Sequence, residues 1–140
     1  MDKNFKVGQS NELVQGDKIF DLHNCYDFSG FFLRNDYTAF LAFGPNAEYG
    51  IGLPPVLLEF CRLDYLMLSS DFFTLDRIDL DEIGYKSPND IDDQWLLGED
   101  QADSECHIFF RFLGGHFVRM HGSRAELREA SIQLDMTASP

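Results

Sequence analysis

Alternating apolar and polar positions are the main pattern of the chain, and they predict a fold rich in β-strands. Residues 26–33 and 37–43 form two strand-like runs around Arg34, Asn35 and Asp36, which is the pattern of a β-hairpin. Both faces of the second run are rather apolar. We therefore expect a sheet that is covered on both sides, or one whose second face meets a partner.

A second hairpin is predicted near the C-terminus. Residues 106–113 and 116–121 are strand-like, and the pair Gly114-Gly115 lies between them. Because two glycines adopt positive φ without strain, this pair predicts a two-residue turn. The register that follows from such a turn puts His107 and His121 on opposite faces of the hairpin.

The residues after this hairpin carry a helix signal. Ser123 and Glu126 match a capping box, with Ser123 as N-cap and Glu126 at the third helical position. Leu127, Ala130 and Leu134 then follow at helical spacing. A helix is therefore predicted directly after the C-terminal hairpin.

Weaker patterns occupy the rest of the chain. Short strands are predicted at 11–15 and 18–22, and a further strand at 73–80. Residues 56–68 fit helical and strand spacing equally well, and we interpret them as a short helical turn followed by a strand in their second half. Together these elements predict an α+β fold in a single domain over residues 1–140, mainly an antiparallel β-sheet with one or two packed helices.

The negative charge of the chain is concentrated in one stretch. The net charge is −13, and Asp71–Glu105 holds twelve carboxylates against the two cations Arg77 and Lys86. Such a charge repels phosphate backbones and anionic membrane surfaces, so direct binding to nucleic acid or membrane is disfavoured. It attracts and steers cationic partners, so the charge favours a basic protein partner or a metal cation.

Apolar side chains are interleaved with these carboxylates, which is typical of a protein interface as well as of a solvated face that keeps a protein soluble. Residues 81–105 are predicted to be mainly a connection, with Trp95 as an apolar anchor. The predicted partner-binding residues are Asp76, Asp79, Asp81, Glu82, Tyr85, Asp90, Asp92, Asp93 and Trp95.

The cysteines and the N-terminus indicate a compartment. Cys25, Cys61 and Cys106 are an odd number of widely spaced cysteines, which we interpret as reduced and mostly buried, without a disulfide. The first ten residues lack the apolar stretch of a signal peptide, and no later run is long enough to span a bilayer. A cytoplasmic protein is therefore expected.

Histidine and arginine side chains offer an alternative to binding alone. His116, His121, Arg111 and Arg119 supply the residue types of a ribonuclease-like acid–base site. In the predicted register, however, the two arginines lie on opposite faces, and the acidic chain opposes an anionic substrate. We predict no catalytic residues, but an enzyme or metal-binding domain that uses these histidines remains the alternative.

Metal-binding patterns are incomplete. His23, Cys25, Cys106 and His107 could form a mixed zinc site only if the fold brought them together, since their spacing matches no known zinc motif. The aspartate clusters at 79–81 and 90–93 fail as EF-hand loops at the fifth and the sixth position, respectively. No metal and no cofactor is predicted.

The acidic run Asp71–Glu105, with Tyr85 and Trp95 among its carboxylates, resembles the small acidic immunity proteins that bacteria make against their own secreted toxins. This resemblance implies a non-enzymatic inhibitor that binds a basic toxin, such as a nuclease, with carboxylates where the substrate phosphates would lie. A structural subunit that self-associates through its spare aromatic faces is a further alternative.

Overall fold

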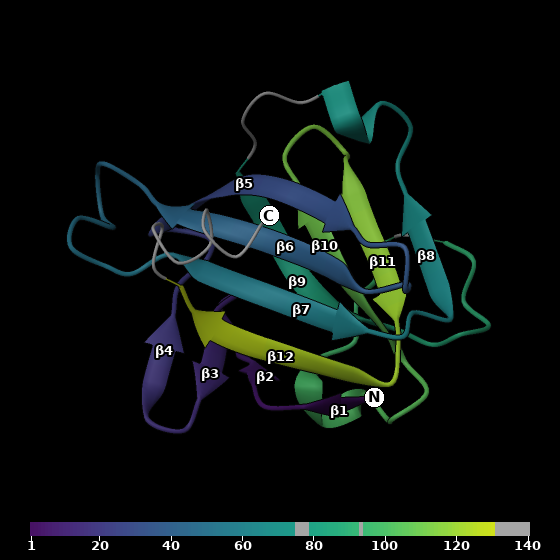
Figure 1. The fold of residues 1–140 in the computed structure, drawn as a ribbon. Coiled ribbons are helices and arrows are strands. Elements are labelled where there is room, and N and C mark those ends of the chain that lie inside the picture. The colour runs from purple at the N-terminus through teal and green to yellow at the C-terminus, as the bar shows by residue number, and fades with distance from the viewer. Residues whose placement is uncertain (75–78, 93, 131–140) are drawn as a thin grey trace.

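The computed structural model describes residues 1–74, 79–92 and 94–130, and its regular structure is almost entirely β-strand (Figure 1). Two larger sheets pack face to face, and a small third sheet lies beside them. The helical segments among the described residues are two short 3-10 helices, Phe72–Thr74 and Glu99–Gln101. The predicted α+β fold with packed helices is therefore wrong, whereas the predicted dominance of antiparallel sheet is confirmed.

The first large sheet has five strands in the order β1-β12-β7-β6-β5. All neighbours in it are antiparallel except β1 and β12, which run parallel. The hairpin predicted around Arg34, Asn35 and Asp36 is confirmed as β5 and β6. The strands are β1 (Asp2–Lys3), β12 (Arg124–Glu129), β7 (Val56–Cys61), β6 (Ala39–Pro45) and β5 (Tyr26–Leu33).

The helix predicted after Ser123 is wrong for the described residues, which form the strand β12, and Leu134 of the predicted apolar stripe lies outside them. Ala125 and Leu127 are buried and alternate with half-buried or exposed residues, so the pattern has the period of two that a strand requires. Pairing with β7 buries these two side chains against the core, which outweighs the local helix signal. The Ser123 hydroxyl donates to the carbonyl of Cys61 at 3.2 Å instead of capping a helix.

The helical turn predicted at the start of residues 56–68 is also wrong. Val56, Leu58 and Phe60 are buried at alternate positions of β7, which lies between β6 and β12. A central strand has sheet neighbours on both sides, so its backbone hydrogen bonds favour the extended form over a turn of helix. The strand predicted in the second half of this run is confirmed as β8 (Tyr65–Leu68).

The second large sheet has four antiparallel strands in the order β8-β11-β10-β9. It contains the predicted C-terminal hairpin, β10 and β11, and an additional strand, β9, where a connection was expected from residue 81. Of the strand predicted at 73–80, residues 75–78 lie outside the described residues and only Leu80 belongs to β9. The strands are β8 (Tyr65–Leu68), β11 (Phe117–His121), β10 (His107–Phe112) and β9 (Leu80–Lys86).

The register of the C-terminal hairpin differs by one residue from the predicted one. Phe110 pairs with Val118, and the Phe112 N–H donates to the carbonyl of His116 at 2.8 Å, so the loop has three residues instead of two. Gly114 and Gly115 in this loop have φ of 87° and 82°, which favours glycine. Because a shift of one residue turns every side chain of a strand to the other face, the predicted faces are wrong.

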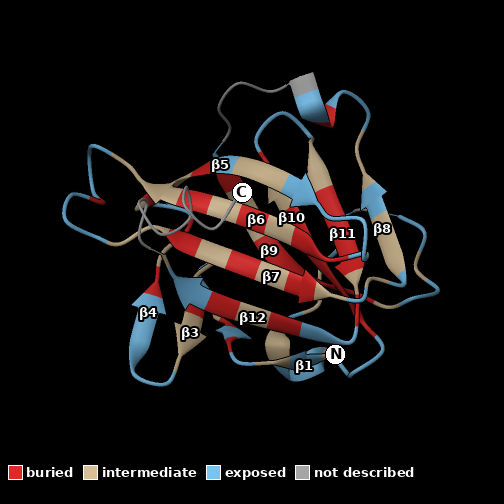
Figure 2. Cartoon of the chain, in the orientation of Figure 1, coloured by how far each residue is buried: buried red, intermediate tan, exposed pale blue. Residues whose placement is uncertain are grey.

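A core of aromatic and aliphatic side chains packs between the two large sheets. Figure 2 shows buried residues along the strands of both sheets. The rings of Phe60 and Phe110 join the two sheets at 6.2 Å, and those of Phe28 and Phe112 at 4.8 Å. Phe72, from the 3-10 helix, closes one end of this cluster at 5.9 Å from Phe28. Phenylalanine accounts for much of the apolar area that the fold buries.

The third sheet forms from the N-terminal residues, and its strands are β2 (Lys6–Val7), β3 (Leu13–Gln15) and β4 (Lys18–Phe20). It confirms the short strands predicted at 11–15 and 18–22. Leu13 and Phe20 attach it to the core. Within the described ranges, no helix has the length and apolar character needed to cross a membrane.

Candidate functional site: an acidic loop clamped to a sheet

Two cations are buried on the outer face of the four-stranded sheet. Lys86, at the end of β9, is 0% exposed, and Arg119 in β11 is 4% exposed. Burial of a charge is costly unless the group is paired and hydrogen-bonded. Both carboxylate partners of Lys86 and two of the three acceptors of Arg119 come from the segment formed by residues 87–92 and 94–98. We call this segment the acidic loop, and it crosses this face of the sheet.

Lys86 holds the acidic loop through two carboxylates. Its Nζ lies 2.8 Å from Oδ1 of Asp92 and 3.3 Å from Oδ2 of Asp90. The hydrogen bond from Lys86 and a further one from the Gln94 N–H hold the pKa of Asp92 below its ordinary value. Two carboxylates predicted to face a partner are therefore counter-ions of a buried lysine.

Arg119 holds the same loop through its backbone. Its Nη1 donates to the carbonyl of Asp90 at 2.7 Å, and its Nη2 donates to the carbonyl of Ser87 at 3.1 Å. Its Nε donates to Nδ1 of His107 at 2.9 Å, and the guanidinium lies 5.2 Å from the ring of Tyr65. Every nitrogen of this buried guanidinium thus has an acceptor, as burial requires.

His107 must be neutral to accept the bond from Arg119, because the protonated imidazole has no acceptor nitrogen. Burial, followed by the charge of Arg119, lowers the pKa of His107 from the ordinary 6.5 to about 4. The ring also packs against Tyr65, with 4.2 Å between centroids and an angle of 33° between the ring planes. At neutral pH the His107 side chain is therefore a positioning group for Arg119.

The far end of the acidic loop is fixed by contacts with β9 and β10. Leu97 forms a bridge with Tyr85, with N–O distances of 3.0 and 2.8 Å. Arg111 pairs with Glu82 and donates to the carbonyl of Gln94 at 3.3 Å. The loop is thus tied to the sheet at both ends.

Gly84 allows the loop to approach the sheet closely. A Cβ atom at this position would lie 2.6 Å from Cβ of Leu96 and 2.9 Å from the carbonyl oxygen of Leu97. Real Cβ atoms do not come so close to other heavy atoms. The glycine is therefore required where the loop passes over β9.

Two large apolar side chains of this clamped loop point into solvent. Ile91 is 98% exposed and Trp95 is 83% exposed. The side chain of Asp92, which follows Ile91, is 58% exposed even though it binds Lys86. The loop therefore presents an apolar surface with a carboxylate beside it.

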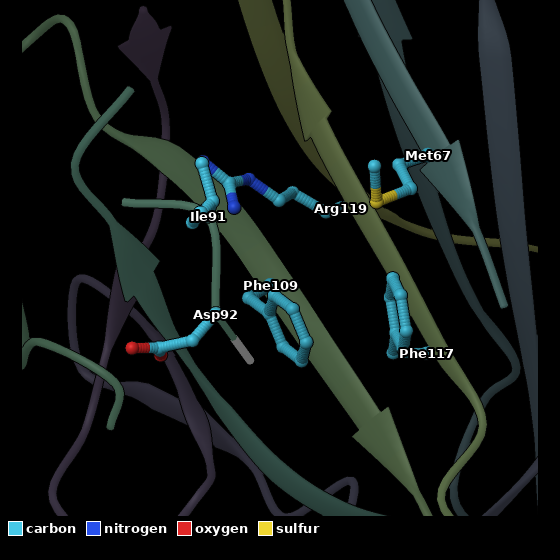
Figure 3. Close-up of a pocket in the computed structure, with 6 residues that line it drawn as sticks. All are labelled: Met67, Ile91, Asp92, Phe109, Phe117 and Arg119. Carbon is cyan, nitrogen blue, oxygen red and sulfur yellow. The ribbon is translucent and has the colours of Figure 1, made fainter. Parts of the chain in front are cut away.

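A cleft of about 280 Å³ opens between the acidic loop and the sheet (Figure 3). The stacked rings of Phe109 and Phe117, 5.1 Å apart, form its apolar side. A cleft of this size accepts one side chain of a partner and is smaller than usual for a drug-sized ligand. Its lining residues are Met67, Ile91, Asp92, Phe109, Phe117 and Arg119.

Tyr85 lies inside the protein. Its hydroxyl donates to Glu99 at 2.6 Å and accepts a hydrogen bond from Lys3, and the ring is 2% exposed. Burial and the Glu99 carboxylate raise the pKa of Tyr85. The bond between Lys3 and Glu99, at 2.8 Å, connects β1 to the second 3-10 helix. In this structure Tyr85 is therefore a buried residue whose hydroxyl links Lys3 and Glu99.

The other predicted partner-binding residues are spread over several places. Asp79 is exposed and Asp81 is half-buried, while the carboxylate of Glu82 pairs with Arg111. Asp76 and Asp93 lie outside the described residues. Of the predicted set, Asp79, Asp92 and Trp95 are exposed.

Two histidines meet on the outer face, contrary to the predicted register. The rings of His107 and His121 lie 5.6 Å apart, while His116 lies at the hairpin loop. Nδ1 of His121 lies 2.7 Å from Asp64, and its Nε2 lies 3.0 Å from the carbonyl of Ser104. Both nitrogens of His121 are thus engaged within the protein.

Metal-binding side chains do not gather anywhere in the described ranges: no group of three or more His, Cys, Asp or Glu residues there could hold a metal ion. The three cysteines are free, and only Cys106 is buried, so the expectation of mostly buried cysteines is wrong.

Sequence reasoning missed the structural roles of Lys86 and Arg119 and the exposure of Ile91. The sequence does contain a signal for the strand register that places Arg119 on the outer face. The even-numbered residues Ile108 and Phe110 in one strand and Val118 in the other are all apolar. These residues can share the core face only with the observed register. No comparable signal marks Ile91.

Comparison with known proteins adds no relative: no family, no curated protein and no solved structure matches the chain.

Proposed function

We propose that this protein is a non-enzymatic binding protein, an inhibitor of the immunity kind that neutralises a basic toxin by binding it through the acidic loop. The observation that carries the proposal is the exposure of Ile91 and Trp95 on a loop that two buried cations hold in place. Tryptophan is enriched among the few residues that dominate binding energy at interfaces.

Preorganisation supports this role. The loop is fixed by Lys86 and Arg119 at one end and by Leu97 and Leu96 at the other. A surface that is ordered before binding loses less conformational entropy when a partner covers it. The contacts that clamp the loop therefore favour tight binding without touching the partner.

The charges keep the role that the sequence predicts for them, which is to attract and steer a cationic partner. Because Asp90 and Asp92 are paired with Lys86, they are partly neutralised within the protein. The net charge of −13 instead acts at long range and raises the association rate with a basic partner. In this proposal Ile91 and Trp95 supply the affinity, and the charge of the whole chain supplies the steering.

The free cysteines are consistent with action in the cytoplasm of the producing cell, where thiols stay reduced. An immunity protein in that compartment would bind the toxin before its export or after its entry.

The proposal is tested by affinity capture from the cells that make the protein, with washes at low and then moderate salt. We expect one basic protein at near-equal stoichiometry, released as salt screens the charges. The double variant Ile91→Ser, Trp95→Ser should lose this partner, because it removes the exposed apolar surface and leaves Lys86 and Arg119 in place.

A matched control is Ile19→Ser, because Ile19 is also exposed, at 68%, but lies on β4 in the third sheet. It should retain the partner. Retention of the partner by the double variant, or its loss in both variants, would contradict the assignment of the interface to the acidic loop.

A further inference from the structure

The two large sheets have four edge strands, and three of them are protected. β1 has only two residues, and β5 carries a bulge between Phe28 and Gly30. β9 is covered at Tyr85 by the bridge to Leu97. Short strands, bulges and covering loops are the usual means of preventing a sheet edge from pairing with another chain.

Within residues 1–74, 79–92 and 94–130, the remaining edge, β8, has no such protection. Its residues Tyr65, Leu66, Met67 and Leu68 include no charge and no proline, and its pairing with β11 has no bulge. Figure 1 shows no described strand beyond it. An uncharged edge of this kind is a template for pairing with another strand.

Backbone groups of β8 point away from its own sheet. The N–H of Ser69, directly after β8, donates to the carbonyl of Phe117 at 3.1 Å. Because antiparallel strands bond through alternate residues, Met67 and Tyr65 also bond toward β11. The N–H and C=O groups of Leu66 and Leu68 therefore face outward at the edge.

The side chains around this edge define what could pair with it. Met67, 46% exposed, lies on the outer face and lines the cleft with Phe109 and Phe117 (Figure 3). Leu66 and Leu68 lie on the other face, against the core. A residue added opposite Met67 would place its side chain on the cleft side, so an apolar residue fits there.

We propose that β8 binds an extended segment of a basic protein by β-strand addition. The main-chain groups of Leu66 and Leu68 supply the hydrogen bonds, and the cleft beside Met67 receives one apolar side chain. The proposal rests on the proposed function only for the basic character of the partner. To the proposed function it adds how the partner is recognised, namely by pairing of one of its strands with β8.

Charge decides between a basic partner and a second copy of this chain. Two copies would each bring a net charge of −13 to an interface built on four residues. Repulsion on this scale disfavours pairing of β8 with itself, whereas a basic segment is attracted. The occupant is therefore a strand from a basic chain.

The probe for this edge is the synthetic peptide acetyl-KVLVLK-amide, with acetyl-EVLVLE-amide as its charge-reversed control. Amide hydrogen exchange and chemical shifts of the full chain are followed by NMR as peptide is added. The basic peptide should slow exchange at the Leu66 and Leu68 amides about tenfold at saturation. The acidic peptide should bind at least about tenfold more weakly at low salt.

A matched pair of variants isolates the backbone. Leu68→Pro removes an N–H that faces outward and leaves the bonds between β8 and β11 intact. Leu68→Ala loses the same side-chain packing but keeps the N–H. We expect Leu68→Pro to bind the basic peptide about tenfold more weakly than Leu68→Ala, with both variants folded by circular dichroism.

Other outcomes overturn the proposal. Equal binding by the two variants, absence of protection at Leu66 and Leu68, or protection on β5 would exclude strand addition at β8. Self-association that grows with salt and disappears in Leu68→Pro would make a second copy the occupant. If this test fails while the Ile91 and Trp95 variant loses its partner, the acidic loop binds the partner without strand addition.

Discussion

At the scale of single residues, the bond from Arg119 to His107 depends on protonation. Nδ1 accepts from the guanidinium only while the imidazole is neutral. The same guanidinium holds the carbonyls of Ser87 and Asp90, so His107 influences the acidic loop without touching it.

The stability of the fold should therefore depend on pH through His107. Its pKa falls from the ordinary 6.5 to about 4 on folding, so the unfolded chain binds a proton at a higher pH than the folded chain does. The contribution of this residue is complete above about pH 6.5 and is lost as the pH falls toward 4. Urea unfolding at several pH values in this window should show the free energy of unfolding rising with pH.

His107→Asn is the control, because the Asn side-chain oxygen can accept the bond from Arg119 but does not titrate. Its free energy of unfolding should change less between pH 4.5 and 6.5 than that of the unmodified protein. Carboxylates with lowered pKa, such as Asp92, remain in both proteins and cancel in the comparison. Identical pH dependence in the two proteins would show that His107 is not linked to folding.

At the scale of elements, the close approach of the acidic loop to β9 depends on Gly84. Gly84→Ala should lift Leu96 and Leu97 from the sheet and lower the free energy of unfolding by about 1–3 kcal/mol. Hydrogen exchange should become faster at the amides of Tyr85 and Leu97, which form the bridge.

Gly44→Ala is a matched control for this change. Gly44 lies in β6, and a Cβ there would have no heavy atom within 4 Å. This variant should keep the stability of the unmodified protein. If both variants unfold at the same urea concentration, the loop does not pack on Gly84 as described.

The elements also show where a local pattern competes with a global one. Gly114-Gly115 favours a two-residue turn, and Ser123 with Glu126 favours a helix start, yet neither forms. In both places the alternation of apolar residues agrees with the observed strands. Burial of a whole face contributes more free energy than one turn or one cap, so the longer pattern decides.

At the scale of the whole molecule, the net charge of −13 opposes folding through self-repulsion. Raising NaCl from 0.02 to 0.2 M at pH 7 should therefore increase the melting temperature by about 2–4 °C, which corresponds to roughly 1 kcal/mol. Thermal unfolding followed by circular dichroism measures this shift.

The same measurement near pH 4.4, the isoelectric point of the chain, is the control. There the net charge is close to zero, so the melting temperature should respond less to NaCl. An equal response at both pH values would mean that the charges are compensated locally, as Asp90 and Asp92 are by Lys86.

The sequence by itself determined most strands, both principal hairpins and the acidic character, because these depend on local alternation, turn residues and composition. Only the tertiary structure decided that Lys86 and Arg119 are buried, that Asp90 and Asp92 neutralise a lysine, and that Ile91 points outward. The physical reason is that burial and pairing depend on strand register and on which loop covers a face. The Gly-Gly pair alone does not fix the register, although the apolar alternation of the two strands agrees with the observed one, and a change of one residue reverses which side chains can meet.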